Sequence, residues 1–95
     1  MRFTVFVDDN SHYQDESERY KKGDYPTAKA AVAACKKNVD DYLSAAYREG
    51  MSASELYQSY TSFGEDPFVV SESGRTRYSS WAYAKERCSE ICGQS

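Results

Sequence analysis

The chain has 95 residues, a formal net charge of −3 and a pI of about 5.1. A chain of this length forms one domain, residues 1–95, and its acidic balance disfavours free nucleic acid as a partner. We expect no membrane association, because no apolar run approaches membrane-spanning length and no apolar export segment is present. Three cysteines, an odd number, without an export signal predict reduced thiols and a cytoplasmic location.

Aromatic residues make up 15% of the chain, whereas the only leucines and isoleucines are Leu43, Leu56 and Ile91. Each buried ring removes about 150–250 Å² of surface from water, so aromatic rings can replace missing aliphatic side chains in a core. Because tyrosine hydroxyls need water or a hydrogen-bond partner, we expect half-buried tyrosines or a tyrosine-rich interface.

The first elements predicted along the chain are two strands. Residues 2–7 (RFTVFV) alternate so that Val5 and Phe6 point to opposite faces of a strand. Residues 18–22 (ERYKK) predict a second strand, antiparallel to the first, and the turn formers at 23–24 (GD) should end it.

Two helices are predicted next. Thr27 is a typical N-cap, and the spacing of apolar residues predicts a helix that runs to about Arg48. Ser52 and Glu55 form a capping box, in which a hydroxyl and a carboxylate each accept a free backbone N–H, so a second helix should run to about Tyr60 or Ser62.

The last third of the chain predicts one strand and one helix. Pro67 can open a short buried strand over residues 68–70 (FVV), and Gly74 should lie in a polar turn. Ser79 or Ser80 can cap a final helix that ends near Cys92. The predicted order is β-β-α-α-β-α, which indicates an α+β two-layer sandwich: a three-stranded, mostly antiparallel sheet with the helices on one face.

Neither a metal site nor a cofactor site is predicted. A calcium loop that starts at Asp8 would need glycine where Tyr13 stands and glutamate where Arg19 stands. Cys88 and Cys92 lie one helical turn apart, but thiols buried in a core explain them better than zinc. No glycine-rich phosphate loop and no complete catalytic set appears, so the sequence favours a non-enzymatic protein.

The segment at 62–68 (SFGEDPF) is the strongest candidate for function, since it joins a helix to a strand and holds two aromatics and two carboxylates. Tyrosine and phenylalanine beside arginine are typical of protein interfaces. The sequence therefore predicts a protein-interaction domain that binds a protein partner or a second copy of itself. The predicted contact residues are Tyr60, Phe63, Glu65, Asp66, Phe68, Arg75 and Arg77.

Two alternatives stay open. A small-ligand binder or enzyme could use Glu65 and Asp66 together with His12, the only histidine, if the fold brings them close. Weak binding of single-stranded nucleic acid could use the basic C-terminal segment, in which aromatic rings can stack on bases. Its residues are Arg75, Arg77, Tyr78, Trp81, Lys85 and Arg87.

Two segments, 60–68 (YTSFGEDPF) and 81–88 (WAYAKERC), resemble a family of small bacterial proteins of unknown function. The opening 7–10 (VDDN) and the turn at 23–25 (GDY) are similar to the same family, so the resemblance covers nearly the whole chain. It implies a free-standing cytosolic domain, and it implies no particular activity, cofactor or partner.

Overall fold

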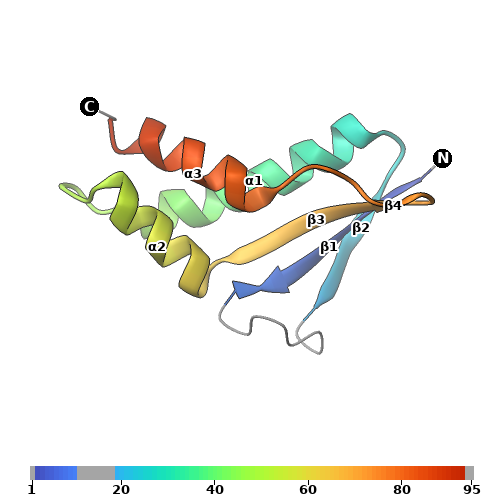
Figure 1. The fold of residues 1–95 in the computed structure, drawn as a ribbon, viewed down its shortest axis with the longest axis horizontal. Helices are drawn as coiled ribbons and strands as arrows, with labels where there is room; N and C mark the ends of the chain where they lie inside the picture. The colour runs from blue at the N-terminus through green and yellow to red at the C-terminus, as the bar shows by residue number, and fades with distance from the viewer. Residues whose placement is uncertain (1, 11–18, 94–95) are drawn as a thin grey trace.

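A computed structural model describes residues 2–10 and 19–93 of the chain. The strands and helices follow in the order β1 (Phe3–Asp9), β2 (Tyr20–Tyr25), α1 (Ala28–Ala46), α2 (Ala53–Phe63), β3 (Glu65–Ser71), β4 (Gly74–Arg75) and α3 (Ser80–Ile91) (Figure 1). The described part of the chain therefore has the α+β composition that the sequence predicts.

The described strands form one antiparallel, four-stranded sheet in the order β2-β1-β3-β4. The prediction of three strands in the order β-β-α-α-β-α is wrong by one strand. The added strand, β4, has only two residues, Gly74 and Arg75, and pairs with Val70 and Ser71. A strand this short leaves no alternating pattern in a sequence, because alternation needs about four residues to be recognised.

The second strand also differs from its prediction, because β2 continues through Gly23 and Asp24 to Tyr25. The register shifts beside these residues: Val5 pairs with Gly23, whereas the next residue, Phe6, pairs with Lys21. This irregularity is a β-bulge on an edge strand, a place where glycine is common inside a strand. Turn-forming residue types at 23–24 therefore mark the bulge and not the end of the strand.

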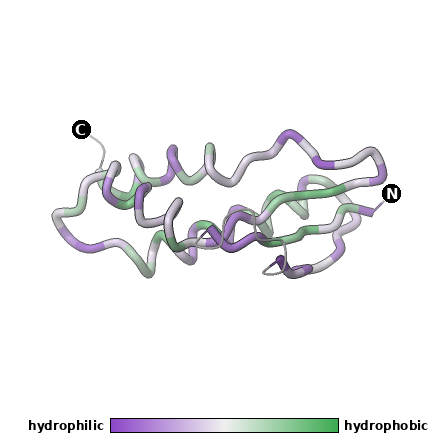
Figure 2. Tube along the Cα trace, turned by 60° about the horizontal axis from the view of Figure 1, so that its bottom comes forward, coloured by the Kyte–Doolittle hydropathy of each residue, from purple (hydrophilic) through white to green (hydrophobic). Residues whose placement is uncertain are grey.

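Alternation along the two central strands separates the faces of the sheet. Val5, Val7 and Val69 are fully buried and form a cluster with Ala31 and Cys35 of α1. The residues between them, such as Phe6 and Phe68, point to the opposite face. No element of the described residues covers that opposite face, and Figure 2 shows the apolar stretches of the trace in the middle of the molecule with hydrophilic loops around them.

Helix α1 takes part in both clusters of buried residues found in the described part of the chain. Its first half packs on the sheet through Ala31 and Cys35, and its second half packs on α2 and α3 through Val39 and Leu43. The molecule is accordingly long and thin, with extents of 43 × 27 × 19 Å. Figure 1 shows α2 and α3 extending past one end of the sheet.

The predicted helix starts are confirmed. The hydroxyl of Thr27 accepts from the N–H of Ala30, and Ser79 caps α3 by accepting from Ala82. The capping box at α2 is complete: the Ser52 hydroxyl accepts from the N–H of Glu55, and the Glu55 carboxylate accepts from the N–H of Ser52.

A tight corner joins α2 to β3 at Gly64. Its N–H donates to the carbonyl of Tyr60, and its own carbonyl accepts from the N–H of Asn10 at 2.9 Å. A Cβ atom on Gly64 would lie 2.7 Å from Cδ1 of Tyr60 and 2.8 Å from its carbonyl oxygen. The corner therefore needs glycine for the close approach of two backbone segments.

Replacement of Gly64 by alanine should destabilise the fold. The added methyl group meets a backbone carbonyl that cannot move without breaking the corner, so we expect the free energy of unfolding to fall by about 1–3 kcal/mol. Urea unfolding followed by circular dichroism measures the change. Gly23→Ala is the matched control, because the added Cβ would lie no closer than 3.5 Å to its nearest neighbour. Equal effects of the two substitutions would contradict this account of the corner.

Candidate functional site

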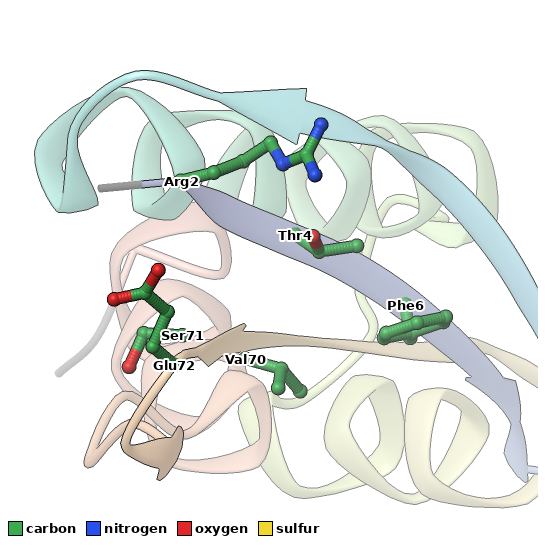
Figure 3. A pocket seen from close by; sticks show the side chains of 6 residues that line it. All are labelled: Arg2, Thr4, Phe6, Val70, Ser71 and Glu72. Carbon is green, nitrogen blue, oxygen red and sulfur yellow. The ribbon is translucent and has the colours of Figure 1, made fainter.

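The candidate site is the face of the sheet that points away from α1, which we call the open face. Its central residues are Thr4 and Phe6 of β1 and Phe68 and Val70 of β3, which pair across the two strands. Figure 3 looks onto this face with the helices behind the sheet. The open face is therefore the one extended surface of the sheet that the described helices leave uncovered.

Two stacked aromatic rings lie at the middle of the open face. The ring centroids of Phe6 and Phe68 are 6.0 Å apart. Two arginines lie over the Phe68 ring, with the guanidinium carbon of Arg75 at 4.1 Å and that of Arg19 at 5.0 Å from its centroid. Cation–π contacts of this kind stabilise both partners, and they leave only 4% of Phe68 exposed.

Each of these arginines is paired with a carboxylate on the same face. Arg19 donates to both oxygens of Asp8, at 2.6 and 3.1 Å, in a bidentate ion pair. Arg75 lies 3.9 Å from Asp66, and Asp66 is the cross-strand neighbour of Asp8. The two ion pairs thus hold the arginine side chains over the aromatic ring.

Among the titratable groups of the open face, Asp66 has the pKa that its surroundings change most. Its side chain is only 20% exposed. The pKa of Asp66 is raised to about 6, chiefly by burial, against the attraction of Arg75 and with a smaller contribution from the neighbouring carboxylate of Asp8. Asp66 therefore changes charge near neutral pH.

A shallow hollow of about 560 Å³ occupies one end of the open face. Phe6 and Val70 form its apolar floor, and the side chains of Arg2 and Glu72 stand at its rim (Figure 3). Thr4 and Ser71 add hydroxyl groups. The hollow is open to solvent, which suits contact with a broad surface better than enclosure of a small ligand.

The structure separates the predicted contact residues. Asp66, Phe68 and Arg75 come together on the open face, as described above. Tyr60 has no exposed surface, because it packs in the core between α1, α2 and α3, and its hydroxyl donates to the carbonyl of Glu65 at 2.6 Å. Tyr60 therefore contributes no contact surface.

Glu65 points to the helical side of the sheet. Its carboxylate accepts hydrogen bonds from Tyr20 of β2 and from Asn38 of α1, each at 3.2 Å. Adjacent residues of a strand point to opposite faces, so Glu65 and Asp66 do not share a site. His12, the third member of the predicted ligand or catalytic set, lies outside the described residues.

Phe63 and Arg77 lie apart from the stacked rings. Phe63 is the last residue of α2 and is 71% exposed, the largest exposure among the large hydrophobic residues described. Arg77 is exposed between β4 and α3. The predicted seven-residue surface is thus divided between the open face, the core, the helical side and two separate exposed positions.

The basic C-terminal segment does not form a single basic patch. Arg87 pairs with Asp40 of α1 at 2.9 Å and with Glu90 at 2.6 Å. Trp81 is partly buried against the helical core, and its ring N–H donates to Asn10. Of the residues in this segment, Arg75 contacts the open face, through Phe68 and Asp66.

Sequence reasoning missed most residues of the open face, among them Phe6 and Arg19. Phe6 could have been found, because alternation along residues 2–7 places it opposite Val5, on the face away from the core. Arg19 carries no such signal. It precedes β2 and reaches Asp8 and Phe68 only because the sheet brings these strands together.

All three cysteines are free thiols, and Cys92 is the one that is partly exposed. Cys35 and Cys88 are buried free thiols, and burial raises the pKa of each to about 11, so both are protonated at neutral pH. No group of three or more potential metal ligands occurs among the described residues. No helix in the described ranges is long and apolar enough to cross a membrane.

No protein-family model matches the sequence, and a search of curated proteins finds no similar sequence. The resemblance to a bacterial family stays a prediction.

Replacement of Asp66 by asparagine should change how stability depends on pH. The folded state holds the Asp66 proton more tightly than the unfolded chain, whose pKa is near 4, so the wild type loses stability as the pH rises from about 4 to about 6. Asparagine cannot ionise, so at pH 7 the variant should be more stable than the wild type by about 3 kcal/mol. Unfolding in urea at a series of pH values measures this.

Glu86→Gln, which removes an exposed carboxylate from α3, is the control for the loss of one negative charge. The account fails if Asp66→Asn and the wild type keep the same difference in unfolding free energy at pH 4 and pH 7.

Proposed function

We propose that this chain is a small non-enzymatic protein-interaction domain whose contact surface is the open face of the sheet. The proposal rests on one observation: the described helices cover only one face of the sheet. The helices bury Val5, Val7 and Val69 completely, whereas Phe6 and Val70 on the other side stay partly accessible beside a hollow. An apolar centre with a charged rim is the usual anatomy of a protein interface.

The charges around this face support a protein partner over a polyanion. Four cations touch or line the face, Arg2, Arg19, Lys21 and Arg75, and four acids do so, Asp8, Asp24, Asp66 and Glu72. Most of the cations already pair with a carboxylate of the same face. Nucleic-acid binding needs an excess of positive charge, and this face offers none.

The arrangement also supports binding over catalysis. Glu65 and Asp66 lie on opposite sides of β3, and the hollow is too open to exclude water from a reacting group. What the face can provide is area, the partly accessible ring of Phe6 and charges held in fixed positions. These are the properties that a protein partner uses.

Replacement of Val70 by aspartate should weaken partner binding at least tenfold, because an unpaired carboxylate would be placed in the apolar centre of the contact. The partner is first identified by crosslinking of the tagged chain in a lysate and mass spectrometry. It is then purified, and its dissociation constant is measured by calorimetry with the wild type and with the variant.

Ser44→Asp, which adds the same group to an exposed position of α1, is the control and should leave binding unchanged. Phe63→Ser tests the predicted loop separately, because Phe63 lies at the end of α2. If Phe63→Ser abolishes binding while Val70→Asp preserves it, the contact surface is the end of α2 and the proposal is wrong. Circular dichroism must show that each variant is folded.

A further inference from the structure

We propose that the partner of the open face is a second copy of this chain, bound face to face. The two-fold axis lies above the open face, runs parallel to β1 and β3, and is midway between these two strands. The inference rests on the proposed function, because it identifies the partner of the surface assigned there. Such a dimer would be a sandwich of two sheets, stacked about 10 Å apart.

One row of residues across the sheet carries the argument. Thr4 pairs with Asp24 on one side and with Val70 on the other, and Val70 pairs with Arg75. The row therefore reads, in strand order, Asp24, Thr4, Val70, Arg75. The two-fold axis passes over the point between Thr4 and Val70. A rotation of 180° about this axis reverses the order of the row, so Asp24 of each copy faces Arg75 of the other.

A second complementary pair lies at the hollow. If the register of β1 and β3 is continued by two residues, Arg2 lies level with Glu72, and Figure 3 shows both at the same end of the hollow. The same axis places Arg2 of each copy opposite Glu72 of the other. The Arg2 side chain is 74% exposed, and its ion pair with Asp24 is long at 3.9 Å. Both side chains can therefore turn toward a second copy.

The centre of the face is also compatible with the same axis. Phe6 of one copy lies opposite Phe68 of the other, because these two residues are paired in the sheet, and the Phe6 ring faces the two arginines that cover Phe68. Asp8 would face Asp66, a pair of like charges. Each of these carboxylates already has its own arginine, Arg19 for Asp8 and Arg75 for Asp66, which offsets the repulsion.

The charge of the rest of the molecule favours this orientation. The chain carries −3 overall and the open face carries four cations and four acids, so the remaining surface holds the excess negative charge. Contact through the open face therefore brings no excess of like charge together. A surface that contacts itself across a two-fold axis must be self-complementary, and the open face meets that condition.

The size of the face sets the strength of the dimer. β1 and β3 have seven residues each, β2 has six and β4 has two, so strands about 4.8 Å apart with a rise of about 3.3 Å per residue give a face of roughly 350 Å² per copy. The total of roughly 700 Å² is well below the range of stable dimers, so the association should be weak and reversible. It should appear between about 1 µM and about 1 mM protein.

A charge exchange at the hollow tests the dimer. Sedimentation velocity over this concentration range should show the wild type shifting from monomer to dimer. Arg2→Glu and Glu72→Arg should each raise the dissociation constant about tenfold. Each substitution places two like charges opposite each other, and the symmetry of the dimer repeats this contact at a second position. The double variant R2E/E72R restores opposite charges and should return to the wild-type value. Glu86→Arg on α3 makes the same charge change on the helical side and should have no effect.

These measurements separate failure of the dimer from failure of the proposed function. A wild type that is monomeric up to about 1 mM overturns the inference. So does a dimer that both single variants leave unchanged, or one that the double variant fails to restore while circular dichroism shows it folded. If the chain is monomeric and Val70→Asp still weakens binding of a different purified protein, the proposed function stands and only the choice of partner is wrong.

Discussion

Burial of one side of β1 and β3 beneath α1 determines how the rest of this molecule is arranged. Val5, Val7 and Val69 lose all contact with water against Ala31 and Cys35. Because successive side chains of a strand point in opposite directions, this burial commits the intervening residues to the other side of the sheet. Phe6, Phe68 and Asp66 lie on the open face for that reason, and a slip of one residue would move them into the core.

Local signals in the sequence predicted the elements well where a cap or an alternation was present. Thr27, Ser52 and Ser79 begin their helices as expected, and the alternation of residues 2–7 gave the correct faces of β1. Prediction failed where pairing with another strand decides the outcome. Neither β4 nor the bulge beside Gly23 can be recognised without the strand that it pairs with.

The candidate site was predictable only in part for the same reason. The segment 62–68 pointed to Asp66 and Phe68, but the sequence alone could not show that β3 begins directly after Gly64, at Glu65, and so sends Glu65 and Asp66 to opposite faces. Tyr60 appeared to be a contact residue because tyrosines are common at interfaces, and it is instead the largest fully buried side chain. Arg19 became part of the site through the fold alone.

The sharing of α1 between two clusters of buried residues has a consequence for folding. Neither cluster is complete without this helix, since Cys35 belongs to the sheet side and Val39, one turn later, belongs to the helical side. Loss of either cluster would expose one half of α1 and weaken the hold of the other. The two ends of this elongated chain should consequently unfold together in a single cooperative transition, with the slowest amide hydrogen exchange in the middle of α1.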